Sequence, residues 1–309
     1  MADAQPSPAG LVVAIFGPTA TGKSAVAAAL ACRVAVDLIS ADSMQLYRGV
    51  PVLTNQPSEA TALVAIWELS HVASLGEYQR LAHECIDSSL MAGRTPVVVG
   101  GTGLYLRAAL AELDLPPDVA PQARRRWEAL YARQGPAAAH AALAARDARA
   151  AAAVHPNDRK RVVRALELAE AGHSLRPRNS SLWSDATRHP SAVFGLELPA
   201  DVLLSRIRLR ARAMILRGAL GEARRAAGAN LSETARHVIG IDELNELSTE
   251  EAEKAIVERT RRYAAYQRKW MRRVPDLIAL DARRQPDDLA DEILEVARAR
   301  QRLPGHRAR

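Results

Sequence analysis

The chain has 309 residues, of which 48% are hydrophobic and 25% charged, so it is a globular protein and not a disordered one. Its 42 Lys and Arg against 35 Asp and Glu give a formal net charge of +7, which favours a polyanionic partner only if the charges cluster. Cys32 and Cys85 exclude a disulfide framework and are expected as buried, reduced thiols, and without a signal segment or a membrane-length apolar run we expect a cytoplasmic protein that does not contact a membrane.

Short apolar runs that end in glycine or a polar residue predict the strands of a parallel sheet. Residues 11–17 form the first run, and a helix is expected from 23 to about 34. Residues 37–40 and 95–101 form two more runs, and a second helix follows the latter. Repetition of strand, turn and helix is typical of an α/β fold, whose ligands bind beyond the C-terminal ends of the strands.

The chain changes character at about residue 115. Residues 115–190 begin with a Pro-rich stretch, continue with Ala-rich and Arg-rich helix formers, and carry no strand pattern. Residues 191–198 predict a return to the sheet. We therefore expect a P-loop α/β core with a parallel sheet flanked by helices, an all-helical insertion domain, and flexible or peripheral tails. The expected bounds are 10–114 with 191–285 for the core, 115–190 for the insertion, and 1–9 and 286–309 for the tails.

One motif points to phosphate binding, because it fits G-x-x-x-x-G-K-[ST] between the first strand and the first helix. Its glycines let backbone amides turn toward phosphate oxygens, and the helix N-terminus adds positive potential. Lys23 supplies a positive charge, and the Ser24 hydroxyl can ligate Mg²⁺. The motif consists of Gly17, Pro18, Thr19, Ala20, Thr21, Gly22, Lys23 and Ser24.

Two further polar stretches follow predicted strands and face the same sheet edge. Asp42 comes after the second strand, where a carboxylate can accept a proton, hold a metal or cap a helix. Gln45, in the same stretch, can pair with the edge of a base. Thr102 lies in a Gly-Gly-Thr-Gly turn after the third strand, where it either faces this edge or caps the next helix.

Together these stretches resemble the tRNA dimethylallyltransferase family, also called tRNA isopentenyltransferases. The resemblance extends in order from about Leu11 to Asp281, which no isolated motif would produce by chance. Four more segments are similar to the family's HPND segment, its paired-arginine helix, its A-I-G-Y and its Y-A-x-x-Q-x-x-W-x-R; they are His155–Glu167, Arg206–Met214, His237–Ile241 and Tyr263–Arg273.

The resemblance implies transfer of a dimethylallyl group from dimethylallyl diphosphate to N6 of adenine 37 in tRNAs that read codons beginning with U. It implies that the P-loop, with Lys23, holds the diphosphate of the donor and that Asp42 is the general base. It also implies that Ser24 supports Mg²⁺, the expected cofactor, and that Arg210 meets the diphosphate. Residues 42–45, which are Asp42, Ser43, Met44 and Gln45, are implied to touch the adenine, and Thr102 and Arg124 to contact tRNA.

Basic residues cluster on two expected helices. Seven fall between Arg259 and Arg273 with no acid among them, and five between Arg206 and Arg217. Residues three or four apart share a helix face, so Arg261, Arg268 and Arg272 can form one stripe. The stripe is either a solvated face or a contact with tRNA phosphates, and beside a phosphate site we favour the contact. Further tRNA contacts, in a monomer that binds the anticodon stem-loop, are expected at Arg159, Arg161, Arg164, Arg268, Lys269 and Arg272.

The chain departs from the family's pattern in places. Pro51 and Gln56 stand where the family usually has Asp and Lys, residues 66–69 replace its H-H-L, and Ala265 and Tyr266 replace a basic pair. Three alternatives stay open. The first is prenyl transfer to a free adenine nucleotide, because residues 54–56 faintly resemble a T-N-K motif found in some enzymes with that activity. The others are a P-loop nucleotide kinase and a non-catalytic RNA-binding protein.

Overall fold

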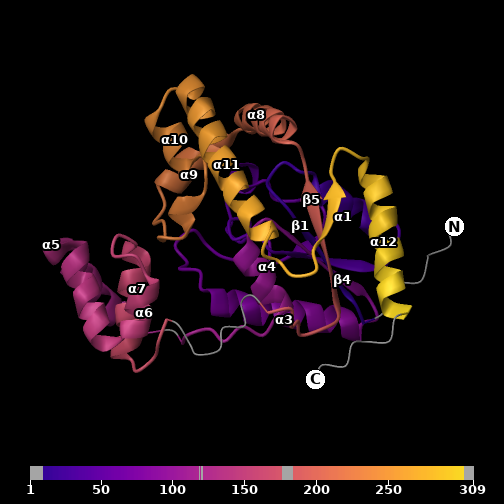
Figure 1. Cartoon of the computed structure of the whole chain (residues 1–309). Helices are drawn as coiled ribbons and strands as arrows, with labels where there is room; N and C mark the ends of the chain where they lie inside the picture. Colours follow the sequence, from indigo (N-terminus) through magenta and orange to yellow (C-terminus); the bar gives the residue numbers. More distant parts are fainter. Residues whose placement is uncertain (1–9, 118, 120, 176–183, 303–309) are drawn as a thin grey trace. The chain divides into compact units, whose positions relative to one another are not determined.

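The computed structural model describes residues 10–117, 119, 121–175 and 184–302, and it divides into two compact units (Figure 1). The core unit comprises Met1–Glu112 and Asp185–Arg309, and the helical unit comprises Leu113–Ser184. A helical segment therefore interrupts the core, ending six residues before the expected boundary at 190.

A six-stranded, all-parallel sheet forms the centre of the core unit, with the strand order β3-β2-β4-β1-β5-β6. The expected α/β fold with a parallel sheet flanked by helices is confirmed. In register, Phe16 of β1 pairs with Gly100 of β4, so the turns after these two strands are neighbours. The strands are β1 (Val12–Phe16), β2 (Val36–Ser40), β3 (Thr61–Ala62), β4 (Thr95–Gly100), β5 (Ser191–Glu197) and β6 (Ile278–Asp281).

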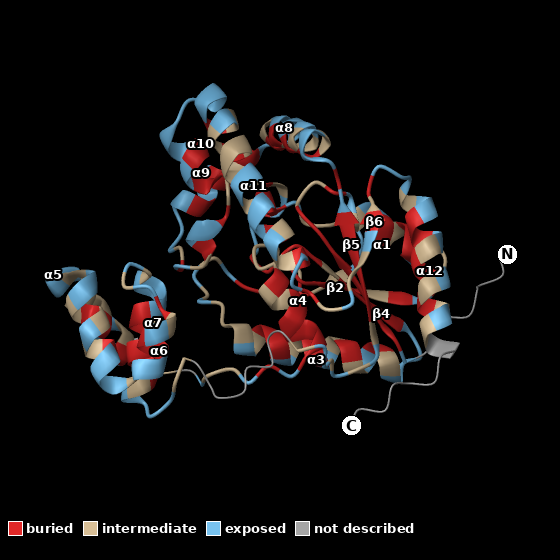
Figure 2. Ribbon diagram, in the orientation of Figure 1, coloured by how far each residue is buried: buried red, intermediate tan, exposed pale blue. Residues whose placement is uncertain are grey.

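Helices cover both faces of the sheet, which is why the central strand β1 is apolar and buried along its whole length (Figure 2). One face packs with α1 and α12 in a single cluster that includes Val13, Ile15, Phe194 and Ile293. The other face packs with α3 and α4. The helices of the core unit are α1 (Lys23–Ala31), α2 (Pro51–Thr54), α3 (Leu75–Met91), α4 (Gly103–Leu110), α8 (Ala200–Leu216), α9 (Ala219–Ala227), α10 (Ile241–Glu246), α11 (Thr249–Met271) and α12 (Pro286–Arg302), with a short 3₁₀ turn at Ala235–His237.

The C-terminal region differs from the sequence prediction. The peripheral tail expected from residue 286 is wrong for 286–302, because α12 packs on α1 and buries Leu289, Ile293 and Leu294 in the main core. Its apolar residues recur at helical spacing, and burial of that face stabilises the helix against the sheet. Residues 1–9 and 303–309 lie outside the described residues.

The helical unit has its own small core. Its helices are α5 (Pro121–Arg146), α6 (Ala148–Ala153) and α7 (Arg159–Glu170), and α5 is kinked where Gly135 has a φ of 81° before Pro136. Trp127, Leu143, Val162 and Leu166 are buried together within it. The HPND segment is the turn that starts α7, where the Asp158 carboxylate accepts a hydrogen bond from the amide of Arg161.

Two further sequence predictions concern the burial of the cysteines and membrane-spanning helices. The expectation of two buried thiols is wrong: Cys32, just after α1, is exposed, and Cys85 of α3 is half-buried. Among the described residues no helix is long and apolar enough to cross a membrane.

Candidate active site

The phosphate-binding motif forms a tight loop between β1 and α1. Gly22 adopts a left-handed backbone with φ 96° immediately before the helix, which a glycine tolerates without strain. The backbone also turns at Ala20, where φ is 66°. The Thr21 hydroxyl donates to the carbonyl of Pro18 at 2.8 Å and closes the loop from inside. The motif therefore lies between a strand and a helix N-terminus, as its sequence predicts.

Lys23 lies over this loop. Its Nζ donates to the carbonyl oxygens of Gly17 and Pro18 at 2.9 and 2.8 Å, and no ion pair within the described residues involves it. Burial lowers the pKa of Lys23 to about 8; Asp42 opposes the shift and Arg210 adds to it. A partly desolvated ammonium without a carboxylate partner is well suited to receive an anion.

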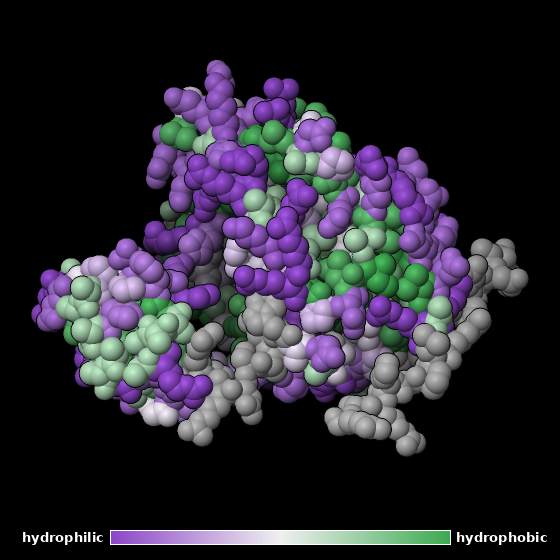
Figure 3. All heavy atoms as spheres, in the orientation of Figure 1, coloured by the Kyte–Doolittle hydropathy of each residue, from purple (hydrophilic) through white to green (hydrophobic). Residues whose placement is uncertain are grey.

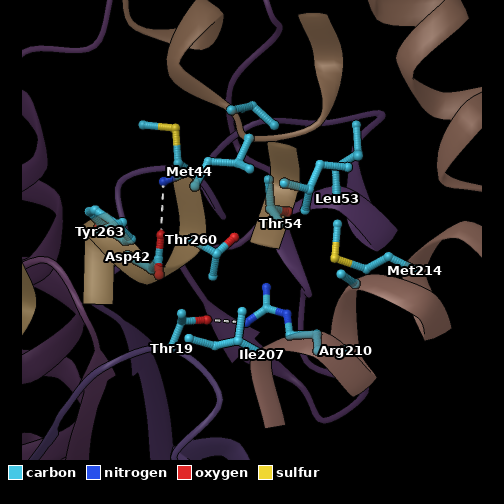
Figure 4. A pocket seen from close by; sticks show the side chains of 14 residues that line it. Thr19, Asp42, Met44, Leu53, Thr54, Ile207, Arg210, Met214, Thr260 and Tyr263 are labelled. Carbon is cyan, nitrogen blue, oxygen red and sulfur yellow. Dashed lines mark hydrogen bonds between the residues drawn. The ribbon is translucent and has the colours of Figure 1, made fainter. Parts of the chain in front are cut away.

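Arg210 faces the loop from α8. Its guanidinium donates to the hydroxyl of Thr19 and points into the pocket shown in Figure 4. Burial lowers the pKa of Arg210 and Asp42 opposes the change, but an arginine at this depth remains charged. Arg206, one helical turn earlier, lines the same phosphate-loop pocket. The basic run on α8 therefore divides, since Arg208 and Arg212 line a groove on another side of the helix.

Asp42 follows β2 and faces both Lys23 and Arg210. One carboxylate oxygen accepts a hydrogen bond from the amide of Met44 at 3.0 Å, which holds the side chain toward the pocket (Figure 4). Gly100 makes this placement possible, because any Cβ there would collide with the backbone of Ala41. The carboxylate retains acceptor capacity toward the cavity, as a proton acceptor requires.

A chain of hydroxyl groups lies beside Asp42. The Thr102 hydroxyl accepts a hydrogen bond from the Ser43 amide at 3.2 Å and lies 3.2 Å from the Tyr263 hydroxyl of α11. Burial, with Asp42 nearby, raises the pKa of Tyr263, although hydrogen bonds to Thr102 and Gln267 act in the opposite direction. Tyr263 therefore keeps its proton at neutral pH.

Two adjoining pockets meet at these residues. A polar pocket of about 960 Å³, open to solvent, is lined by the P-loop and the ends of β2 and β4. An apolar pocket of about 580 Å³, also open, lies beside it and is lined chiefly by aliphatic and Met side chains. The two share Thr19, Asp42, Thr54 and Arg210. The apolar lining comes from Met44, Leu53, Ile207, Ala211, Met214, Val238, Ile239 and Ile256.

The structure brings most of the predicted site residues of the core unit together around the pockets. The side chain of Gln45 instead forms hydrogen bonds within the protein. The Gln45 amide accepts a hydrogen bond from the Ser40 hydroxyl and donates to the carbonyl of Asn55, each at 2.9 Å. Its polar atoms therefore hold the segment after β2 against the segment after α2, although the residue lines the polar pocket. Each of these bonds uses one donor or one lone pair of the carboxamide, which leaves Gln45 with reduced capacity to pair with a base.

The predicted arginines of the helical unit divide into paired and exposed residues. Arg164 of α7 contacts Glu167 at 3.1 Å, and Arg124 of α5 contacts Glu128 at 3.1 Å. Arg159 and Arg161 are exposed at the start of α7, and within the described residues Arg161 has a close acid, Asp158 at 3.6 Å, whereas Arg159 forms no ion pair. All four residues belong to the helical unit, Leu113–Ser184.

The basic stripe on α11 also divides. Arg261 and Arg262 both pair with Glu258 at 2.8 Å. Arg268, Lys269 and Arg272 have no acidic partner within the described part of the chain. Hydrophilic residues gather along α11 on the face shown in Figure 3.

The departures near residue 51 have a structural explanation. Pro51 is the first residue of α2, where a missing amide hydrogen leaves no hydrogen bond unmade. The buried Glu222 carboxylate of α9 accepts from the amides of Val52 and Leu53 at 2.9–3.0 Å. Gln56 donates to the carbonyl of Tyr47 at 2.7 Å. This segment is thus held by the protein itself, and it places Leu53 and Thr54 in the apolar pocket.

Sequence reasoning missed several residues that complete the site. Leu53, Ile207 and Met214 line the apolar pocket but read as ordinary helix residues in the sequence. Tyr263 and Gln267 were noted as parts of a motif but were assigned no contact. The signal that could have found them is their spacing of four on α11, which places both on one helix face.

Oxygen ligands for a magnesium ion are available. Ser24 and Asp42 both line the polar pocket. Mg²⁺ commonly binds one or two protein oxygens together with phosphate oxygens and water. No group of three or more His, Cys, Asp or Glu side chains among the described residues can hold a metal alone. The donor set therefore fits an ion that arrives with a diphosphate.

Comparison with known proteins identifies the family. Residues 45–274 match the family described as IPP transferase, and residues 10–64 match the one described as isopentenyl transferase. The tRNA dimethylallyltransferase of Thermobifida fusca is 41% identical over 282 residues, which cover 85% of this chain and 88% of that protein. The chain belongs to the tRNA dimethylallyltransferase family. It is therefore a prenyltransferase, as expected from its motifs.

Solved structures of tRNA dimethylallyltransferases and isopentenyltransferases agree with the fold. The crystal structure of the tRNA isopentenylpyrophosphate transferase from Bacillus halodurans has a TM-score of 0.68 at 30% identity and covers 94% of this chain and 97% of that one. A eukaryotic dimethylallyltransferase crystallised while acting on tRNA has a TM-score of 0.72, over 88% of this chain and 74% of that one. At 24% identity, the second likeness concerns the fold alone.

Proposed function

We propose that this protein transfers a dimethylallyl group from dimethylallyl diphosphate to N6 of adenine 37 in tRNAs that read codons beginning with U. The observation that carries the proposal is the pair of adjoining pockets with Asp42, Thr19 and Arg210 at their junction. The polar pocket suits a diphosphate, and the apolar pocket suits a short hydrocarbon chain attached to it. Membership of the family supports the same reaction.

The apolar lining favours a prenyl donor over ATP. A nucleoside needs hydrogen-bond partners for its ribose and base, because buried polar groups left unpaired are costly. Aliphatic side chains such as Leu53, Ile207 and Ile256 offer none, whereas they suit a five-carbon chain. The P-loop itself recognises charge and geometry and does not discriminate between the two ligands.

The reaction follows from the placement of the charges. N6 of adenine attacks C1 of the dimethylallyl group, the bond between C1 and the diphosphate oxygen breaks, and N6 loses one proton. Asp42 accepts that proton as general base. Lys23, Arg210 and the P-loop amides hold the diphosphate and take up its developing negative charge. When bound, Mg²⁺ held by Ser24 neutralises part of the same charge.

Binding of tRNA is assigned to basic residues of both units. Arg268, Lys269 and Arg272 lack acidic partners within the described residues, and they would contact phosphates. Arg159 and Arg161 of the helical unit would do the same toward the anticodon stem-loop. The target adenine must leave its stack to reach the prenyl carbon.

One assay tests this function against the alternatives. Purified protein is incubated with Mg²⁺ and labelled dimethylallyl diphosphate in the presence of unmodified tRNA, AMP or ATP. We expect label in tRNA, and digestion should recover it as N6-(dimethylallyl)adenosine from position 37. Label in AMP instead would indicate transfer to a free nucleotide. Phosphate transfer from ATP to AMP with unlabelled tRNA would indicate a kinase, and tRNA binding without any transfer would indicate an RNA-binding protein.

A further inference from the structure

Gln267 joins two loops that are far apart in the sequence. This residue of α11 is only 2% exposed. Its side-chain oxygen accepts a hydrogen bond from the Thr19 amide in the P-loop at 2.9 Å. Its side-chain nitrogen donates to the carbonyl of Gly101, after β4, also at 2.9 Å. Because β1 and β4 are neighbours in the sheet, one carboxamide spans the two turns that follow them.

The two turns border different substrates in the proposed reaction. Thr19 belongs to the loop that would hold the donor diphosphate, and Arg210 holds its hydroxyl from the other side. Gly101 precedes Thr102, whose hydroxyl contacts Ser43 and Tyr263 on the side of Asp42. The distance between donor and acceptor therefore depends on how these turns are held relative to each other.

The chemistry of the bridge requires a carboxamide. A backbone amide must donate and a backbone carbonyl must accept, so the side chain between them needs one acceptor and one donor. A carboxylate offers only acceptors, and it matches the pair of partners only when it is protonated. Gly101 also needs to be glycine, because a Cβ there would collide with the Gln267 nitrogen.

We propose that Gln267 is a positioning residue that sets the distance between the donor diphosphate and the acceptor base. The inference rests on the proposed function. Gln267 lines neither pocket, both of its polar groups are bonded to backbone, and it also contacts the Tyr263 hydroxyl beside Asp42, so it acts through the two loops and Tyr263 and not on the substrates. Misplacement of reacting groups by about 1 Å can cost about 10²-fold in rate.

The test is the pH dependence of Gln267→Glu, compared with Gln267→Met. Single-turnover transfer is measured from pH 5.5 to 8 with saturating dimethylallyl diphosphate and tRNA, and each rate is divided by that of the wild type. At pH 8 we expect Gln267→Glu to be slower by about 10²-fold, because its ionised carboxylate faces the Gly101 carbonyl. The ratio should recover as pH falls, since the protonated acid can again donate. Gln267→Met, which cannot donate and accepts only weakly, should stay slow at every pH.

The charged and titratable groups near Gln267 are also present in the wild type, so the ratio removes the contribution that they make to both proteins. They are Lys23, Asp42, Arg210 and Tyr263. Asn245→Asp is the matched control, because the Asn245 amide nitrogen also donates to backbone carbonyls, those of Ala223 and Ile241, at 3.0 and 2.7 Å. Its ratio to the wild type should not change with pH.

The outcomes separate this inference from the proposed function. Absence of transfer by the wild-type protein would contradict the function. Active wild type with a Gln267→Glu ratio that is constant across pH, or with Gln267→Met at the wild-type single-turnover rate, would overturn the positioning role. If neither variant folds, as judged by circular dichroism, Gly101→Ala is used instead, because its added Cβ would displace the Gln267 side-chain carboxamide. It should then slow single-turnover transfer while the Kd for tRNA stays unchanged, and an unchanged rate would equally overturn the inference.

Discussion

The active-site pockets and the helical unit use their charged residues differently. In the pockets, Lys23, Asp42 and Arg210 face a shared cavity and form no ion pair within the described residues. In the helical unit, Arg124 and Arg164 pair with acids of the same unit. Desolvated charges without partners are unfavourable for folding, so their presence indicates a substrate that completes them. Paired charges instead stabilise the unit that carries them.

The largest expected effect concerns Asp42. Asp42→Asn keeps an oxygen to accept from the Met44 amide but removes the proton acceptor. We expect prenyl transfer to fall by about 10²-fold or more, with little change in the Kd for donor or tRNA. Asp37→Asn, on β2 just before Asp42 but bonded to Ser89 and Arg94, is the control and should transfer normally. Near-normal turnover of Asp42→Asn would remove Asp42 from the base role.

Arg164 gives the second prediction, which tests whether the paired arginines are structural. Arg164→Ala leaves the Glu167 carboxylate, only 3% exposed, without its 3.1 Å partner. We expect a loss of about 2 kcal/mol in the free energy of unfolding, measured by urea titration followed by circular dichroism. Arg161→Ala, which removes an exposed pair at 3.6 Å, should cost less than about 1 kcal/mol. Equal stabilities for the two variants would contradict the distinction.

The sequence predicts more of the active-site pockets than of the helical unit, for a physical reason. The P-loop and Asp42 are local patterns after apolar runs, and the parallel sheet brings the ends of those runs to one edge. The pairing of Arg164 with Glu167 and of Arg124 with Glu128 is also local in spacing. The exposure of each residue, however, depends on how α5 packs on α7, and sequence spacing does not specify that packing.

Contacts between distant segments could not be predicted from the sequence. Gln267 meets a partner 248 positions away, and Glu222 stabilises the start of α2 from α9. The strand β3 has only two residues and shows no alternation to detect. The sequence of helix α12 does show apolar residues at helical spacing. Its local pattern does not indicate, however, that this apolar face packs on α1.

The pH dependence of donor binding tests the unpaired ammonium of Lys23. Its pKa of about 8 lies below the ordinary 10.5 because of burial. A diphosphate binds the protonated form, so the affinity for dimethylallyl diphosphate should weaken as pH rises through about 8, approaching tenfold per pH unit. Calorimetry above and below pH 8 measures the change. Lys23→Met should bind weakly at every pH and lose this dependence.

The same shift has a consequence for stability. Between pH 8 and 10.5 the unfolded chain holds a proton on Lys23 that the folded protein has lost, so stability from this residue rises with pH over that window. Below pH 8 the buried charge is fully unfavourable. Lys23→Met should therefore raise the melting temperature at pH 7, and its advantage should shrink toward pH 10.5. A lower melting temperature at pH 7 would contradict an unfavourable buried ammonium.

The smallest expected effect concerns the basic residues at the C-terminal end of α11, including its C-cap Arg272, that form no ion pair within the described residues. Replacing Arg268, Lys269 and Arg272 with Ala should lower the slope of log K against log salt for tRNA by about 2, since each lost phosphate contact removes about 0.7–0.9. The matched control replaces three paired arginines, Arg212, Arg261 and Arg262, which contact Glu253 and Glu258. Both triple variants change the net charge from +7 to +4, by subtraction of three.

The control separates local contact from overall charge. If tRNA binds the unpaired residues of α11, the first variant should show the flatter slope, because Glu253 and Glu258 already offset two of the three control charges. Equal flattening in both variants would mean that net charge alone governs binding, and unchanged slopes would place this surface away from tRNA. Either result would remove the distinction between paired and unpaired arginines on α11 while leaving the chemistry at Asp42 and Lys23 untouched.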